Sequence, residues 1–190
     1  PDYGSLWYLL RAADRTLSPT VAVSLAVAGW VLALALGAAL ALSVPRRPTI
    51  AEVSLVVVGV VLMTGRSLPV QAALWLLPLV ALAGLRWRDH LVWVTGEVLY
   101  FVAIWLYLGG QSDPNRGLPL PWLMVFSVLR LAGIAWLVVA AWRQAVRRVP
   151  VPEDYLAAPD ADPQLDASVE PDELAGPLAA RPDAMTIALR

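Results

Sequence analysis

The hydrophobic residues of this 190-residue chain are concentrated in blocks of about 20 residues that all lie before residue 145. A helix of that length, at about 1.5 Å per residue, crosses a hydrocarbon core of about 30 Å. Hydrophobic residues make up 59% of the chain, above the roughly 45–50% of soluble domains, and a soluble core would not need such blocks. The pattern predicts an all-α, polytopic transmembrane helix bundle.

The breaks between the blocks predict about five helices. The first block ends at Pro45-Arg46-Arg47-Pro48, which combines a helix stop with charges at the membrane edge. The second is short for a span, so we expect a short or tilted helix there. Pro78 is expected to kink the third helix, and Gly109-Gly110 to end the fourth. The predicted helices cover 17–44, 50–63, 69–84, 91–108 and 121–142.

The composition changes at residue 149, which divides the chain into a helical region, 1–148, and a tail, 149–190. Proline and carboxylates dominate the tail, and such a segment cannot bury enough apolar area to offset the entropy of ordering it. We expect a disordered, acidic tail, with a regulatory or partner-binding role as the alternative. The chain opens on Pro1 instead of methionine, so we expect it to be a trimmed protein or a fragment.

Arginine placement predicts the orientation, because cytoplasmic loops near membrane ends collect positive charge. Every basic side chain is arginine, and with abundant alanine and proline this suggests a GC-rich bacterial genome and hence a bacterial plasma membrane. A cytoplasmic tail gives the expected bias, with loops 1–16, 64–68 and 109–120 on the outer face. The arginines then expected inside are Arg46, Arg47, Arg86, Arg88, Arg143, Arg147 and Arg148, against Arg11, Arg15, Arg66 and Arg116 outside.

The segment from Arg66 to Gln71 is the main candidate site, because it interrupts the apolar pattern at a membrane surface. Irregular backbone at membrane depth is tolerated where it is buried in protein or lines a cavity. Arg66 offers bidentate contacts to a phosphate, and Ser67 and Gln71 offer hydrogen bonds to a phosphate or sugar. The alternative is an ordinary interhelical loop with an arginine that reaches the interface.

Glu97 and Arg130 are the two ionisable residues well inside predicted helices. Unpaired charges there are costly, so we predict a structural ion pair, with a transport or catalytic role as the alternative. The single histidine, His90, is expected at the interface and not as a metal ligand. Asp2, beside an aromatic segment, resembles a sugar-binding surface. No hydrolase, metalloprotease, P-loop or dinucleotide fingerprint is present, and no cofactor, metal or nucleic acid is expected.

Arg66, Gln71, Trp75 and Pro78 together resemble a motif of membrane glycosyltransferases that use polyprenyl-phosphate sugars, specifically actinobacterial glycosyltransferase family 87 of the GT-C class. In that family a basic residue precedes a Ser-Pro-Gln element, and Trp and Pro follow in the next helix. This chain departs from the pattern with Pro69-Val70 in place of Ser-Pro.

Two further stretches resemble the family, 3–8 and 88–93, together with Glu97, Tyr100-Phe101 and Trp105. The resemblance implies transfer of a hexose, typically mannose, from a polyprenyl-phosphate donor on the extracytoplasmic face. It also implies that the catalytic acid lies upstream, in a first outer loop, so that this chain is a C-terminal portion that is inactive without its N-terminal transmembrane half. The alternative function is a non-enzymatic membrane protein, either a transporter component or a scaffold.

Overall fold

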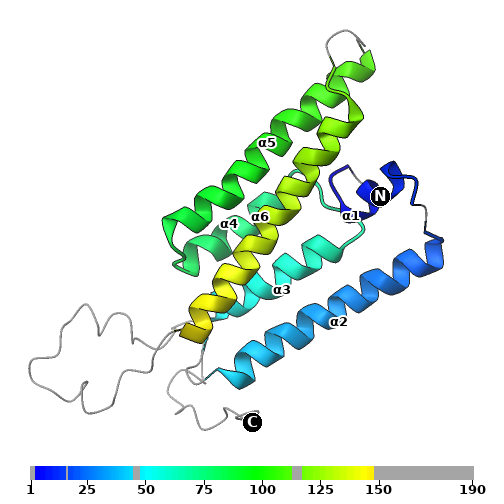
Figure 1. Ribbon diagram of the computed structural model, residues 1–190. Helices are drawn as coiled ribbons and strands as arrows, with labels where there is room; N and C mark the ends of the chain where they lie inside the picture. The colour runs from blue at the N-terminus through cyan, green and yellow to red at the C-terminus, as the bar shows by residue number, and fades with distance from the viewer. Residues whose placement is uncertain (1–2, 16, 45–47, 113–116, 148–190) are drawn as a thin grey trace, which may run out of the picture.

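The computed structural model describes residues 3–15, 17–44, 48–112 and 117–147, and these residues form six helices and no strand. The predicted all-α helix bundle is therefore confirmed. Asp2, the Arg46-Arg47 pair, Arg116 and the tail from 149 to 190 lie outside the described residues. The helices, shown in Figure 1, are α1 (Leu6–Ala12), α2 (Pro19–Ser43), α3 (Ile50–Thr64), α4 (Ala72–Leu82), α5 (Trp87–Ser112) and α6 (Leu120–Arg147).

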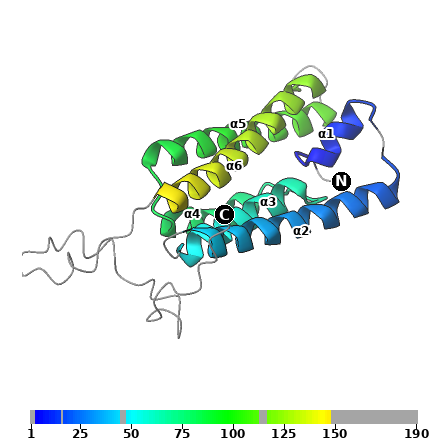
Figure 2. The same cartoon turned by 60° about the horizontal axis from the view of Figure 1, so that its bottom comes forward.

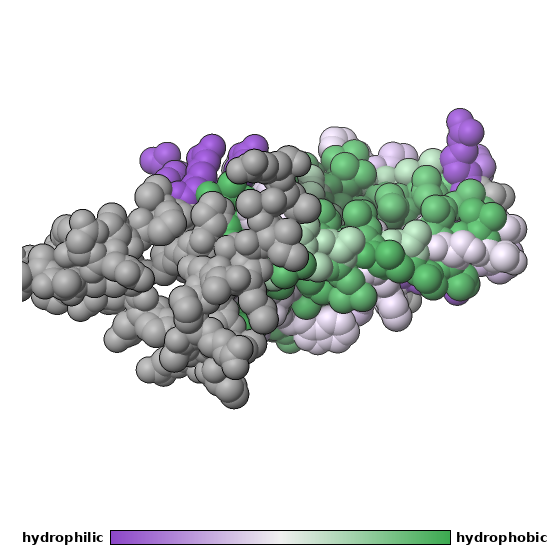
Figure 3. Space-filling view, turned by 90° about the horizontal axis from the view of Figure 1, so that it is seen from below, coloured by the Kyte–Doolittle hydropathy of each residue, from purple (hydrophilic) through white to green (hydrophobic). Residues whose placement is uncertain are grey.

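Three of these helices, α2, α5 and α6, are long and apolar enough to cross a membrane. Their 25, 26 and 28 residues correspond to about 38–42 Å of helix, more than a hydrocarbon core of about 30 Å. Large apolar side chains such as Trp30 and Leu34 are exposed along α2. Figure 3 shows this apolar surface lying between two ends that carry hydrophilic side chains. The chain is a polytopic membrane protein.

Helices α3 and α4 form a hairpin that is too short to cross the membrane. Their 15 and 11 residues give only about 22 and 16 Å of helix. The start of α3 and the end of α4 lie together, because Gln144 donates hydrogen bonds both to Glu52 and to the carbonyl of Ala83. The hairpin therefore returns to the end of the bundle at which it began (Figures 1 and 2). The two helices run in opposite directions, and the second predicted helix is short, as expected.

We call the two ends of the bundle the α1 end and the Arg147 end. The α1 end holds α1, the start of α2 and the start of α6, whereas the Arg147 end holds the end of α2, the hairpin's two outer ends and the end of α6 (Figure 1). Helix α6 packs along α5 and α3, and α2 packs against α3. Figure 2 shows α1 at the right of the view, between α2 and the α5–α6 pair.

One predicted helix end and one segment predicted as loop differ most from the expectations. Helix α5 runs through Gly109-Gly110 to Ser112, so the predicted stop at these glycines is wrong. A Cβ on Gly110 would collide with the backbone of Gly117, which indicates that Gly110 allows a close backbone approach and does not end the helix. Helix α1 was expected as loop. Ser5 caps its start by accepting a hydrogen bond from the Tyr8 N–H, at 3.2 Å.

Candidate functional site

The break between α3 and α4, residues 65–71, is recessed inside the bundle. Thr64 packs against Gly29, which lies ten residues into α2 from Pro19, or about 15 Å along that helix from its first residue. Arg130, which contacts the break, lies ten residues into α6 from Leu120, giving the same distance of about 15 Å. The break therefore lies inward of the first residues of α2 and α6, and its place relative to the membrane surface stays a prediction.

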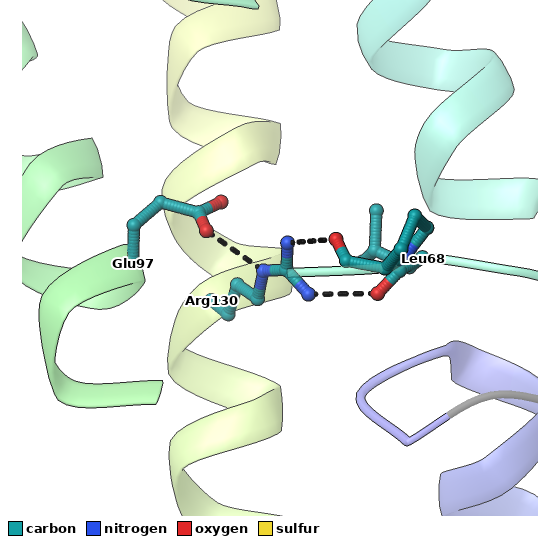
Figure 4. Close-up of polar contacts among 4 residues, drawn as sticks. Leu68, Glu97 and Arg130 are labelled. Carbon is teal, nitrogen blue, oxygen red and sulfur yellow. Dashed lines mark hydrogen bonds and ion pairs between the residues drawn. The ribbon is translucent and has the colours of Figure 1, made fainter. Parts of the chain in front are cut away.

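Arg130 binds the backbone of the break with both terminal nitrogens of its guanidinium group (Figure 4). Its Nη1 donates to the carbonyl of Leu68 at 2.9 Å, and its Nη2 donates to the carbonyl of Pro69 at 2.8 Å. Its Nε donates to the Oε2 atom of Glu97 at 2.9 Å. The guanidinium carbon lies 4.6 Å from the centre of the Tyr100 ring, a cation–π distance. Arg130 is fully buried.

Close packing of α5 against α6 places Glu97 beside Arg130. A Cβ on Gly96 would lie 3.0 Å from the Leu129 carbonyl oxygen and 3.4 Å from the Arg130 Cα atom. Glycine thus lets the two backbones approach, as small residues do in membrane helix pairs. The structure brings together the two residues for which the sequence predicts an ion pair, with side chains 12% and 0% exposed. Neither buried charge is left alone.

Helix α1 supplies a second contact to the recessed break. The indole Nε1 of Trp7 donates a hydrogen bond to the carbonyl of Thr64 at 3.0 Å. Next to Trp7, the ring of Tyr8 lies 4.9 Å from that of Tyr3. Burial, followed by a hydrogen bond with Tyr107, raises the pKa of the Tyr8 hydroxyl well above its usual range. This tyrosine is therefore neutral at physiological pH and adds no negative charge near the break.

A cleft of about 280 Å³ opens between α1, the start of α2 and the break. Three arginines line it, Arg11 and Arg15 from the α1 region and Arg66 from the break. None of them pairs with a carboxylate within the described ranges. The rest of the lining is aromatic or aliphatic: Trp7, Leu10, Leu17, Pro19 and Ala22. Three cations beside an apolar wall suit an anion that carries a hydrophobic group.

The structure separates the residues predicted to form the site. Arg66 lines the cleft, but Ser67 and Gln71, both exposed, are not among the residues that line it. Trp75, which contributes to the family resemblance, is 60% exposed on α4. His90 lies near the start of α5, where its Nε2 is 3.4 Å from the Val80 carbonyl.

Sequence reasoning missed Trp7, Arg11 and Arg15 as site residues and treated the two arginines only as loop charges. One signal was available for Trp7 and Arg11, because residues four apart share a face where the chain is helical, but no helix was predicted there. Arg15 follows the end of α1, so helical spacing does not place it.

Comparisons with protein-family models, with curated proteins and with solved structures found no match to this chain. The fold and the cleft together define a class, a helical membrane protein with a recessed helix break and an arginine-lined cleft at one end.

Proposed function

We propose that this chain is the membrane part of a glycosyltransferase that uses a polyprenyl-phosphate hexose, and that the arginine cleft binds the donor phosphate. The observation that carries the proposal is the gathering of Arg11, Arg15 and Arg66, without a carboxylate partner in the described residues, at one end of a membrane bundle. Guanidinium groups bind phosphate oxygens in pairs. The apolar wall of the cleft, which includes Leu17 and Ala22 of the α2 region, suits the first prenyl units.

The chemistry assigns a definite role to the three arginines. Hexose transfer breaks the bond between the sugar C1 and the phosphate oxygen, and it forms a bond between C1 and an acceptor hydroxyl oxygen. The bond pair stays on the phosphate, whose negative charge grows, and a base takes the hydroxyl proton. Fixed cations at the phosphate stabilise that developing charge. The family resemblance places the catalytic acid or base upstream of this chain, and mannose is the hexose it favours.

The proposal places the α1 end outside a bacterial plasma membrane and the Arg147 end in the cytoplasm. Within the described residues the Arg147 end carries four arginines at the helix ends: Arg86, Arg88, Arg143 and Arg147. The α1 end carries three, and all three line the cleft. The excess of four over three has the sign that the positive-inside rule associates with a cytoplasmic Arg147 end.

Phosphate binding is tested with undecaprenyl phosphate added to the full chain in detergent, followed by native mass spectrometry. Arg66→Ala is expected to weaken binding about tenfold, equivalent to about 1.4 kcal/mol, and Arg66→Lys by less, because lysine keeps the charge but loses the paired donors. Arg143→Ala, an exposed arginine at the Arg147 end, is the matched control and should bind as the parent does. Equal binding by Arg66→Ala and the parent would place the phosphate elsewhere.

Transfer is tested in membranes from cells that express the complete gene encoding this chain. Radiolabelled hexose should pass from polyprenyl-phosphate hexose to a membrane acceptor, and Arg66→Ala should slow it about tenfold at matched expression. Activity of Arg66→Ala within twofold of the parent would contradict the role of the cleft. Phosphate-lipid binding without any transfer would favour the alternative, a non-enzymatic transporter component or scaffold.

Orientation is tested by thiol labelling, which is clean because the chain has no cysteine. Ser112→Cys, exposed at the α1 end, should react in intact cells with a membrane-impermeant maleimide. Ser43→Cys, exposed at the Arg147 end, should react only after the cells are opened. The reverse pattern would move the arginine cleft to the cytoplasmic face.

A further inference from the structure

The break between α3 and α4 interrupts the helical hydrogen bonds of the backbone beside the fully buried Leu68 and Arg130. A buried carbonyl without a partner costs free energy, so irregular backbone inside a membrane bundle needs donors from the protein. Side chains supply such donors to three carbonyls at or beside the break: Trp7 donates to Thr64, and Arg130 donates to Leu68 and Pro69. The backbone is thus held by side chains on both sides of Arg66.

Arg66 lies between these held carbonyls, two residues after Thr64 and two residues before Leu68. The backbone at Arg66 therefore has little freedom to move toward or away from the cleft. The Leu68 side chain is also fully buried, so the segment is fixed by packing as well as by hydrogen bonds. The position of Arg66 in the cleft depends on what holds Leu68 and Pro69.

We propose that Arg130 is a positioning residue for the anion site, and that its hold on Leu68 and Pro69 sets the depth at which Arg66 enters the cleft. The inference rests on the proposed phosphate site. Arg130 itself is fully buried and does not line the cleft, so it acts on an anion only through the backbone of the break. Glu97 and the Tyr100 ring orient its guanidinium group.

The geometry of the contact requires arginine. The guanidinium group is planar, and its donors point in fixed directions toward three acceptors on two different segments. A lysine at this position would bring one compact ammonium group, which satisfies Glu97 or the carbonyls but does not span both. Arg130→Lys should therefore keep the charge and lose part of the hold on the break.

The first experiment measures the hold on the break without any ligand. Leu68→Cys should be protected from maleimide in the otherwise unchanged chain in detergent, because Leu68 is buried. Combining it with Arg130→Met and Glu97→Gln, which removes both charges together, should raise the labelling rate about tenfold as the break opens. Ser112→Cys is the control and should label equally in both backgrounds. Val70→Cys is the second probe, because Val70 packs against the Tyr100 and Leu123 cluster.

The second experiment measures whether Arg130 acts through Arg66. Undecaprenyl phosphate binding is compared in four chains, with and without the Arg130→Met/Glu97→Gln pair and with and without Arg66→Ala. The pair is expected to weaken binding about tenfold when Arg66 is present and less than about twofold when Arg66 is alanine, since coupled residues give non-additive effects. Arg130→Lys should lie between the parent and the pair.

The outcomes separate the two proposals. Additive losses in the four chains, or unchanged labelling at both Leu68→Cys and Val70→Cys, would overturn the positioning role of Arg130. If Arg66→Ala alone does not change binding, the phosphate site is wrong, while the labelling experiment still decides whether Arg130 holds the break. A fold control is the unfolding temperature of each chain, and a variant more than about 15 °C below the parent is replaced by Arg130→Lys.

Discussion

Two arginines meet the same helix break and are used in opposite ways. Arg130 is fully buried, and its guanidinium group bonds two backbone carbonyls and one carboxylate. Arg66 is exposed in a cleft with two other arginines and pairs with no carboxylate in the described residues. The guanidinium donors of Arg130 bond groups of the fold, whereas the guanidinium group of Arg66 faces a cleft that a ligand can enter.

The contrast shows how to separate structural from functional charges inside a membrane protein. A buried charge with a full set of partners stabilises the arrangement that it bonds, and its loss is felt as unfolding. A cleft lined by like charges does not stabilise the fold, but it raises the local concentration of an oppositely charged ligand. Substitution of Arg130 should therefore lower the stability most, and substitution of Arg66 should weaken ligand binding with little change in stability.

The largest effect on stability is expected for Arg130→Met. This change leaves Glu97 and the Leu68 carbonyl without their partner and removes one of two donors to the Pro69 carbonyl. We expect it to cost about 3–5 kcal/mol of unfolding free energy. Arg130→Met with Glu97→Gln should cost less, because no charge remains unpaired. Unfolding in mixed micelles with increasing dodecyl sulfate measures both.

The control for this prediction is Arg143→Met, which removes an exposed arginine from the same helix. It should change the unfolding free energy by no more than about 0.5 kcal/mol. A loss of under about 1 kcal/mol in Arg130→Met, or a double variant as damaged as the sum of the singles, would mean that Glu97 and Arg130 are not energetically coupled.

The next effect is expected at the Arg147 end, where Gln144 joins three helices. Its Nε2 donates to Glu52 at 3.1 Å and to the Ala83 carbonyl at 2.7 Å, and Glu52 is fully buried. Gln144→Leu removes donors from two buried acceptors, at a cost of about 1–3 kcal/mol. Gln144→Glu should be worse, because it places a second carboxylate beside Glu52. A smaller loss in Gln144→Glu than in Gln144→Leu would contradict the hydrogen-bond assignment.

The sequence predicted the all-helical bundle because apolar blocks of spanning length are a strong local signal. It also singled out Glu97, Arg130 and Arg66, since charges within apolar blocks are conspicuous. It did not reveal that the break is recessed, because depth depends on how α3 and α4 pack against α2 and α6. The contacts from Arg130 to the Leu68 and Pro69 carbonyls were equally hidden, since a backbone acceptor has no signature in the sequence.

A smaller effect is expected for Trp7→Phe, which removes one hydrogen bond to the break and keeps most of the ring. The lost bond to the Thr64 carbonyl is worth about 0.5–1.5 kcal/mol. Trp30→Phe, at an exposed site on α2, is the matched control and should be nearly neutral. If the two variants unfold together, the Trp7 contact does not hold the break, and Arg130 holds it alone.

The smallest effect on stability is expected for Arg66→Ala, the variant that tests the difference between Arg66 and Arg130 most directly. Arg66 pairs with no carboxylate among the described residues, so its removal should change the unfolding free energy by about 0.5 kcal/mol or less. At low salt, where the three like charges repel most, the removal should stabilise the folded chain. In inorganic phosphate the parent should become more stable than Arg66→Ala. A ligand at ten times its dissociation constant adds about 1.4 kcal/mol to the stability of the folded state. The parent should therefore gain unfolding temperature in phosphate, and Arg66→Ala should gain less. Sodium chloride at equal ionic strength separates binding from screening, since screening acts on both chains through the same repulsion. Equal gains from phosphate and chloride in the parent would show that the three arginines are only screened, and Arg66 would then be an interfacial loop residue.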